Sequence, residues 1–301
     1  MSELGGILSA LVTPFDTKGG IDDGLLRAVV DRSIDGGVGG VVACGSTGEF
    51  AAMSADERRR VVETVVDQTD GRVPVVAQTG GLTAAEAIGH SRHAQAAGAS
   101  VLMLVTPFYE PLTRAETLRY LRTVAGSVDI PVMLYNLPPA TGVNLDPDTV
   151  GRLAREVGNI RYIKDTSGDL AQAGKLVRYH GDVVSTIVGW DGLVLPALCD
   201  GVAGAMCGTA NVIGAELVSV QRAVAAGDLF RARAEWERIY PLIDTLLSTA
   251  FIPGVKAALS ARGLPVGPPR EPLNPLDGEV LARVESLVAG LGEPVAVVSN
   301  R

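Results

Sequence analysis

The sequence contains few aromatic residues and few cysteines. Phe, Trp and Tyr make up 4% of the 301 residues, so a hydrophobic core must consist mainly of Val, Leu, Ile and Ala, as in a parallel sheet covered by helices. The three cysteines, Cys44, Cys199 and Cys207, lack the spacing of metal ligands, and the three histidines form no matching cluster with them. We therefore expect small, buried cysteines and no metal site.

Blocks of basic residues and long apolar runs are missing as well. The net charge is −8 and no basic block interrupts it, so nucleic-acid binding is not expected. No apolar run reaches the ~20 residues that a membrane-spanning helix needs. The first stretch, MSELGGILSALVTPFD, has no basic region before its apolar residues, which a signal peptide would have. These features predict a cytoplasmic protein that does not enter membranes.

Short β-like runs recur along the chain, and helix-like sequence separates most of them. Segments such as SADERRRVVETVVDQT place apolar residues at i, i+3, i+4 and i+7, which is typical of amphipathic helices. Eight strands with helical crossovers predict an α/β fold, a TIM (β/α)8 barrel. A doubly wound sheet is the alternative, but no glycine-rich fingerprint follows the first run. The eight runs are residues 6–14, 39–49, 73–80, 100–108, 130–138, 160–168, 183–190 and 201–209.

The strand pattern stops near residue 225. About three helix-like segments follow, separated by Pro and Gly, and the stretch VGPPREPLNPLD predicts an extended connector between two of them. The sequence therefore predicts a catalytic barrel over residues 1–225. A C-terminal helical appendage over residues 226–301 is expected to pack on the barrel and to end in a short tail.

Lysine is scarce, with 4 copies against 22 arginines. Only Lys164, in YIKDTS, stands where an apolar β-like run meets polar residues. In a TIM barrel, reactive side chains cluster at such C-terminal strand ends. The other strand ends carry mainly hydroxyl, amide and carboxyl groups or small residues: Thr13, Ser46, Thr47, Glu49, Thr79, Thr106, Tyr109, Tyr135, Asn136, Asp165, Thr166, Gly189, Asp191 and Cys207.

This set of side chains suits imine chemistry. A lysine amine in an apolar environment can attack a ketone or an aldehyde, and the protonated imine then accepts electrons from an adjacent C–C bond. An arginine could not replace Lys164, because a guanidinium stays protonated. Tyr135 can move protons, and the N–H groups and hydroxyls of GSTGE (residues 45–49) can hold a carboxylate.

The same residues also have structural interpretations. Lys164 can pair with Asp165 or extend into solvent, and GSTGE can be an ordinary turn before a helix. Tyr135 can be a core tyrosine that is satisfied by a backbone carbonyl. Asp165 and Asp169 are expected to cap helices or form turns rather than to act as acids and bases. Considered one by one, the residues leave these alternatives open.

Taken together, the motifs GSTGEF, TPFYEP, YNLPPATG and IKDTSGD resemble, in this order and spacing, the dihydrodipicolinate synthase/N-acetylneuraminate lyase family. The similarity runs from about residue 5 to residue 270. It implies a class I lyase or aldolase that binds pyruvate through a lysine Schiff base. The covalent imine serves in place of a separate cofactor, and family members are commonly homotetramers, described as dimers of dimers.

The resemblance also implies roles for individual residues. Lys164 matches the Schiff-base lysine, and Tyr135 matches the tyrosine that moves protons at the imine. Thr47, with Ser46 beside it, matches the hydroxyl that relays protons and binds the carboxylate. Tyr109 matches a tyrosine that many members insert into the neighbouring subunit's site. Further substrate contacts are implied for Met206, Thr166, Gly189 and Asp191.

Some positions depart from the pattern of the family. Synthases of the family usually carry an arginine at the position of Ala140, where it binds the carboxylate of aspartate semialdehyde; Arg114 and Arg161 are candidates to replace it. Sialic acid lyases tend to have an acidic residue where this chain has Gly192, and a serine is common at the position of Gly208. Trp190 suggests a less polar acceptor pocket.

We therefore expect a Schiff-base-forming lyase or aldolase whose substrates are pyruvate, bound as the imine, and an aldehyde. Three alternatives remain. The enzyme can be dihydrodipicolinate synthase itself, or a dehydratase of a 2-oxo-3-deoxy sugar acid that forms the same imine. The chain can also be a sensor of 2-oxo acids on a scaffold that no longer catalyses a reaction.

Overall fold

The computed structural model describes residues 4–110 and 112–292, so Pro111 of the TPFYEP motif and the predicted C-terminal tail lie outside the described residues. Eight parallel strands form a closed barrel in sequence order, from β1 to β8. This confirms the predicted TIM barrel. The strands are β1 Gly6–Ala10, β2 Gly40–Ala43, β3 Val75–Gln78, β4 Val101–Val105, β5 Val132–Asn136, β6 Ile160–Asp165, β7 Ser185–Val188 and β8 Gly204–Cys207.

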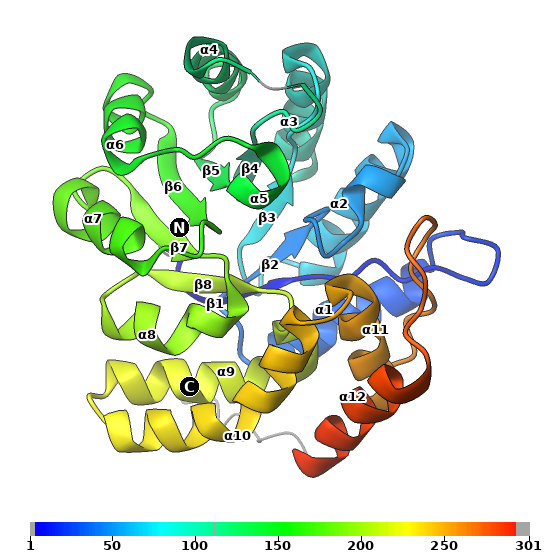
Figure 1. The fold of residues 1–301 in the computed structure, drawn as a ribbon. Helices are drawn as coiled ribbons and strands as arrows, with labels where there is room; N and C mark the ends of the chain where they lie inside the picture. Colours follow the sequence, from blue (N-terminus) through cyan, green and yellow to red (C-terminus); the bar gives the residue numbers. More distant parts are fainter. Residues whose placement is uncertain (1–3, 111, 293–301) are drawn as a thin grey trace.

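Helices surround the strands (Figure 1). Short 3-10 helices lie at Phe50–Ala52 and Asp191–Leu193, within the loops after β2 and β7. The α-helices are α1 Asp23–Asp35, α2 Ala55–Thr69, α3 Ala84–Ala97, α4 Arg114–Ala125, α5 Pro138–Thr141, α6 Pro147–Glu156, α7 Leu170–His180, α8 Val194–Cys199, α9 Ala210–Ala225, α10 Leu229–Leu247, α11 Phe251–Ala261 and α12 Gly278–Gly290.

The strands are buried on both faces, and alternate residues serve different cores. In β4, Leu102 and Leu104 belong to the core between the strands and the helices. Val101, Met103 and Val105 belong to a second apolar cluster inside the barrel. This alternation follows from the two-residue period of a strand. It explains why the strands read as nearly continuous apolar runs in the sequence.

The helices after the barrel are packed against it. α10 lies along α9, and α11 and α12 lie next to each other at the same side (Figure 1). The segment between α11 and α12, predicted as an extended connector, forms no helix or strand, and it turns where the Leu273 N–H donates to the Arg270 carbonyl at 3.0 Å. Within the described residues, no helix is both long enough and apolar enough to cross a membrane.

One expectation about the cysteines is wrong. Cys44 and Cys207 are buried, but Cys199 is exposed. Cys199 is the last residue of the short helix α8, whose buried positions are Val194 and Ala197. A residue two positions after Ala197 falls on the other face of the helix, toward solvent.

Candidate active site

Lys164 and Tyr135 lie side by side inside the barrel. They are directly paired in register between β5 and β6. Lys164 is 6% exposed, and its Nζ lies 4.2 Å from the centre of the Tyr135 ring. Tyr162, two residues before Lys164, belongs to the interior cluster together with Tyr135, so the strand period turns Lys164 inward as well.

Several reactive atoms at this place have no hydrogen-bond or ion-pair partner among the described residues. The Lys164 ammonium makes no ion pair or hydrogen bond there, and neither do the hydroxyls of Tyr135, Thr47 and Ser46. The hydroxyl of Thr166 is buried and also unpaired. Because an unpaired buried polar group costs free energy, such a concentration marks a place where a ligand supplies the missing bonds.

Gly189 makes room for the side chains of β6. It follows β7, and its N–H donates to the carbonyl of Asp165 at 2.8 Å. A Cβ at Gly189 would lie 2.0 Å from Thr166 Oγ1 and 2.6 Å from Lys164 Cε. Both separations are below van der Waals contact, so the lysine keeps its position only if residue 189 has no side chain.

The Ser46–Thr47 turn follows β2 and reaches the end of β8. The turn is closed by N–H groups of Gly48 and Glu49, which donate to the carbonyls of Gly45 and Ser46. Thr47 is 7% exposed. A Cβ at Gly208 would lie 3.1 Å from Thr47 Oγ1 and 2.5 Å from the Phe251 ring of α11. Phe251 therefore occupies the space that a side chain at residue 208 would need.

Asp165 points away from the lysine into a polar network. Its carboxylate accepts hydrogen bonds from Asn136 Nδ2 at 2.9 Å, from Ser167 and from Gln172. Burial raises the pKa of Asp165, and these hydrogen bonds oppose the shift. Asp169 caps α7. Both carboxylates thus have the structural positions that the sequence predicted.

Asp191 and Met206 are buried at the ends of β7 and β8. Asp191 is 4% exposed and accepts hydrogen bonds from Thr209 N at 2.8 Å and Thr209 Oγ1 at 2.6 Å. Burial raises the pKa of Asp191, while the Thr209 hydrogen bonds and the charge of Lys164 lower it. Met206 is 1% exposed and belongs to the interior cluster. The charge of Lys164 therefore influences Asp191, whose Oδ1 is already engaged by Thr209.

Tyr109 is separate from these residues. It lies in the loop after β4, and it is 79% exposed. Within the described chain its ring has no aromatic or cation partner. A single chain therefore does not bring Tyr109 together with Lys164.

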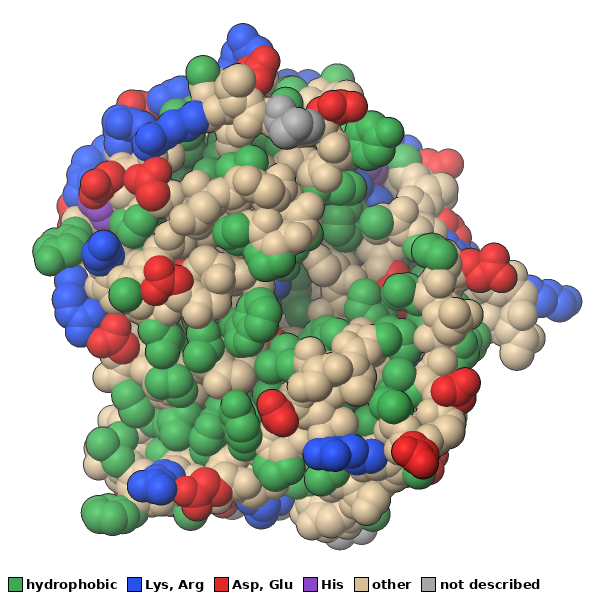
Figure 2. Space-filling view, in the orientation of Figure 1, with side chains coloured by type: hydrophobic (Ala, Val, Ile, Leu, Met, Phe, Trp, Pro, Cys, Tyr) green, Lys and Arg blue, Asp and Glu red, His purple; other side chains and the backbone are tan. Residues whose placement is uncertain are grey.

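A cavity of ≈ 400 Å³ opens beside the reactive residues. In the space-filling view, a hollow near the centre of the barrel mouth is surrounded mainly by hydrophobic and uncharged side chains, and the charged ones lie mostly toward the rim (Figure 2). The lining consists of Ser46, Glu49, Phe50, Ala51, Ala52, Val105, Phe108, Leu137, Ala140, Thr141, Ile252, Arg270, Glu271, Pro272 and Leu273.

The arginines considered as replacements at the Ala140 position do not line this cavity. Arg114 binds Asp146 and Thr149 on the outside of the barrel. Arg161 is the second residue of β6 and is exposed near the end of the strand opposite to Asp165. Trp190, 36% exposed, does not line the cavity either.

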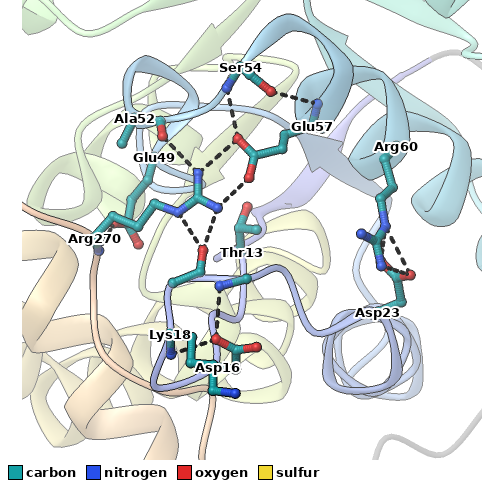
Figure 3. Close-up of polar contacts among 12 residues, drawn as sticks. Thr13, Asp16, Lys18, Asp23, Glu49, Ala52, Ser54, Glu57, Arg60 and Arg270 are labelled. Atoms are coloured by element: carbon teal, nitrogen blue, oxygen red, sulfur yellow. Dashed lines mark hydrogen bonds and ion pairs between the residues drawn. The ribbon is translucent and has the colours of Figure 1, made fainter.

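Arg270 lines the cavity, but its guanidinium is fully engaged. It pairs with Glu57 and donates to the carbonyls of Gly19 and Ala52 (Figure 3). Its hydrogen bonds hold the pKa of Glu57 at about 2. Arg270 lies in the segment between α11 and α12. This segment also contacts the loop that contains Ser46 and Thr47, because the Arg270 N–H donates to Glu49 Oε2 at 2.8 Å.

The C-terminal helices also hold Glu49 directly. Lys256 of α11 places its Nζ 2.6 Å from Glu49 Oε1, and both side chains are almost completely buried. Glu49 has a left-handed backbone with φ 61°. The sequence drew attention to Glu49 at a strand end, but it gave no sign that Lys256 and Arg270, more than 200 residues away, would fix it.

No group of three or more His, Cys, Asp or Glu side chains that could hold a metal occurs in residues 4–110 and 112–292. The arrangement instead offers an amine, several hydroxyls and an adjoining apolar cavity. A TIM barrel that buries a lysine beside a tyrosine at the C-terminal strand ends has the architecture of a class I aldolase or lyase.

Comparison with known proteins identifies the family. Residues 3–290 match the model of the Dihydrodipicolinate synthetase family, and the chain belongs to this family. Its members are pyruvate-dependent lyases and synthases that use a lysine Schiff base. The protein is accordingly an enzyme of this class, and pyruvate and an aldehyde-type compound are the substrates of its family.

Relatives match the chain over nearly its whole length. A 4-hydroxy-tetrahydrodipicolinate synthase from Methanothrix thermoacetophila is 39% identical and covers 96% of this chain and 97% of its own. A dihydrodipicolinate synthase from Bacillus anthracis is 34% identical, with a TM-score of 0.92 and coverage of 96% and 99%. YagE, a prophage protein of E. coli K12 solved in complex with pyruvate, is 31% identical with the same TM-score and coverage.

Proposed function

We propose that Lys164 forms an imine with pyruvate and that the resulting enamine adds to an aldehyde, or that the reverse cleavage takes place. The observation that carries this proposal is the buried, unpaired Lys164 ammonium at 4.2 Å from the ring of Tyr135. Because no ion pair or hydrogen bond with the described residues holds the Lys164 amine, it is available as a nucleophile. Imine formation is the nucleophilic reaction that suits a pyruvate-dependent family.

The reaction balances without an oxidant or a reductant. The neutral Lys164 amine attacks C2 of pyruvate, and the carbinolamine that results takes up one proton and loses water to give a protonated C=N bond. Loss of a proton from C3 gives the enamine, whose C3 attacks the aldehyde carbon, and the aldehyde oxygen takes up a proton. Water then hydrolyses the imine, which frees Lys164 and a 4-hydroxy-2-oxo acid. No cofactor besides the lysine is required.

The hydroxyls would handle the charges and protons of these steps. The carboxylate of pyruvate would lie in the Ser46–Thr47 turn, where two hydroxyls are unpaired and backbone N–H groups are close. Tyr135 and Thr47 would move protons at the imine and at the aldehyde oxygen. Met206, Thr166, Gly189 and Asp191 surround the imine in this proposal. Residues 1–225 would form the catalytic unit and residues 226–301 its support.

Tyr109 would complete the proton path of a neighbouring subunit in a cytoplasmic homotetramer, built as a dimer of dimers. Its 79% exposure supports this, because a tyrosine that serves a neighbour is uncovered in the single chain. Mixed oligomers of Lys164→Ala and Tyr109→Phe test it. Activity above that of either variant alone is expected, because some sites then combine a normal lysine with a normal tyrosine.

A second candidate is 4-hydroxy-tetrahydrodipicolinate synthase, the name of the Methanothrix relative at 39% identity. The same imine would condense with aspartate semialdehyde. Rapid condensation of that aldehyde with pyruvate would establish it. Ala140 is unfavourable for binding of aspartate semialdehyde, because the cavity has no cation at the position where synthases of the family usually carry an arginine.

Borohydride reduction in the presence of pyruvate tests the imine. The wild-type chain should gain the mass of one reduced pyruvate on the peptide that contains Lys164. The gain should disappear in Lys164→Ala and Lys164→Arg, and it should persist in Lys175→Ala, which changes an exposed lysine of α7. Labelling that survives in Lys164→Arg, or no labelling of the wild type, would contradict the proposal.

A further inference from the structure

We infer that the aldehyde substrate of this enzyme has an uncharged, apolar chain rather than a carboxylate or a row of hydroxyls. This inference rests on the proposed function, because it concerns the compound that the pyruvate enamine attacks. It names the substrate class from the chemistry of the ≈ 400 Å³ cavity, whose volume lies within the range of about 300–1,000 Å³ that small-molecule sites have.

The cavity adjoins the reactive residues. Ser46 lines it and directly precedes Thr47. Val105 lines it and is paired in register with Tyr135. Phe108 and Leu137, also in the lining, pack against the interior cluster that contains Tyr135. A substrate whose carbonyl carbon reaches the pyruvate imine at Lys164 therefore extends its chain into this space.

The charged groups of the lining are neutralised within the protein, with one exception. Arg270 is paired with Glu57 and holds two carbonyls. Glu49 is paired with Lys256 and accepts from the Arg270 N–H. Neither group has a free charge for a substrate, and releasing Glu49 would leave the buried Lys256 unpaired, which is costly.

The exception carries a negative charge. Glu271, an exposed residue at the edge of the cavity, makes no ion pair or hydrogen bond with any residue in 4–110 and 112–292. A second carboxylate on the aldehyde would meet an uncompensated carboxylate here and no available cation. Like charges repel, and solvent weakens the repulsion at an exposed residue, so this edge of the cavity offers an anionic chain no attraction.

Hydroxyl groups of a substrate would find few partners apart from the Glu271 carboxylate at the edge. The single O–H of Thr141 is shared between the Leu137 and Val143 carbonyls, and its oxygen accepts from the Val143 N–H. Ser46 is assigned to the carboxylate of pyruvate. Apart from these two hydroxyl residues and the charged residues already described, the lining side chains are apolar, including Phe108, Leu137 and Ile252. Burial of apolar substrate surface against these side chains is the favourable interaction that the cavity offers.

The test compares aldehydes of the same shape. In 4-methylpentanal, two methyl groups replace the two carboxylate oxygens of succinic semialdehyde, and glyceraldehyde represents hydroxyl-rich chains. The wild-type enzyme is given pyruvate and each aldehyde in turn, and the 4-hydroxy-2-oxo acid is quantified by mass spectrometry. We expect kcat/KM for 4-methylpentanal to exceed the values for succinic semialdehyde and glyceraldehyde at least tenfold.

Variants at Ala140 link this selectivity to the cavity. Ala140 is exposed in the short helix α5, so it can be exchanged with little risk to folding. Ala140→Arg adds a free cation and should raise the ratio of succinic semialdehyde to 4-methylpentanal about tenfold to a hundredfold, the range of a charge-assisted hydrogen bond. Ala140→Leu adds volume without charge and should leave this ratio in favour of 4-methylpentanal.

Borohydride trapping of pyruvate is measured on the same preparations. Trapping together with the expected preference supports the inference. Trapping with equal or better use of succinic semialdehyde or glyceraldehyde by the wild type overturns the inference and leaves the imine intact. An absence of trapping overturns the proposed function and this inference with it. A ratio that does not change in Ala140→Arg shows that the cavity is not the acceptor site and overturns the inference.

Discussion

Replacing Lys256 by methionine should destabilise the protein by an amount that far exceeds the effect of an ordinary lysine substitution. Lys256 and Glu49 are 1% and 2% exposed at their side chains, with Nζ and Oε1 2.6 Å apart. Methionine fills a similar volume but removes the charge. Glu49 would then keep only the hydrogen bond from the Arg270 N–H, and it would be a buried carboxylate without a counter-ion.

The structure allows an estimate of the size of this effect. Two unit charges 2.6 Å apart attract each other by about 6 kcal/mol at an effective dielectric constant of about 20. Desolvation of both ions offsets much of this attraction. Loss of one partner of such a buried pair costs about 3–5 kcal/mol, because the other charge stays buried. Lys256 also donates to the Pro268 carbonyl at 3.0 Å and lies over the Phe15 ring, so the upper part of this range is expected.

The assay is a double-mutant cycle. Urea unfolding is measured for the wild type, Lys256→Met, Glu49→Gln and the combination of both. Each single change should lower the free energy of unfolding by about 3–5 kcal/mol. The double variant should be more stable than the sum of the single effects by at least about 2 kcal/mol, because it contains no unpaired charge. Lys175→Met, at an exposed lysine of α7, is the control and should stay within about 0.5 kcal/mol of the wild type.

Additive single effects, or a Lys256→Met effect as small as that of Lys175→Met, would refute the reasoning. Borohydride trapping provides a second measurement. Glu49 stands two residues after Thr47 in a left-handed conformation, and its contacts with Lys256 and Arg270 hold that turn in place. Trapping is measured without denaturant, at a temperature where Lys256→Met is still folded. Under these conditions the rate of pyruvate trapping should be lower in Lys256→Met than in Lys175→Met.

Two further outcomes follow from the site and the core. Gly189→Ala places a Cβ 2.0 Å from Thr166 Oγ1 and 2.6 Å from Lys164 Cε, so the rate of pyruvate trapping should fall by about a hundredfold. The control is Gly89→Ala in α3, where a Cβ meets nothing within 4 Å. This variant should trap pyruvate at the normal rate and gain up to about 1 kcal/mol of stability. Burial lowers the pKa of His90 to about 4, so between about pH 6.5 and pH 4 the unfolded chain binds more protons. The free energy of unfolding should fall by up to about 3 kcal/mol as the pH is lowered through this range, and His90→Gln should remove that part of the slope in pH-dependent urea unfolding.

The barrel and the imine lysine could be predicted because both depend on local patterns. A strand that is buried on both faces needs apolar residues at nearly every position, as in VLMLV of β4, and such runs are visible in the sequence. The position of Lys164 at the end of such a run placed it at the reactive face of a TIM barrel. Its contact with Tyr135 follows from the same rule, since both residues end neighbouring parallel strands.

The fit between distant parts of the chain was not predictable in this way. Gly208 looked like a departure from a common serine, but Phe251 of α11 fills the space beside it. Nothing near Gly208 in the sequence indicates that a ring from another helix will arrive there. The exposure of Cys199 was not predictable either. The helix α8 is too short for its apolar pattern to show which face is buried, and packing in the folded protein decides this.

The charge of the acceptor cavity shows most clearly why contacts are needed in addition to composition. Arg270 lines the cavity, and an arginine there could replace the missing cation at Ala140 if its guanidinium were free. The capping box of α2 places Glu57 at the third helical position after Ser54, where its carboxylate accepts the guanidinium of Arg270. The charge of Arg270 is thus neutralised by a residue in the first turn of α2, more than 200 residues earlier in the chain. A negative Glu271 without a partner among the described residues remains at the edge, and it is this residual charge that turns the absence at Ala140 into a preference for uncharged aldehydes.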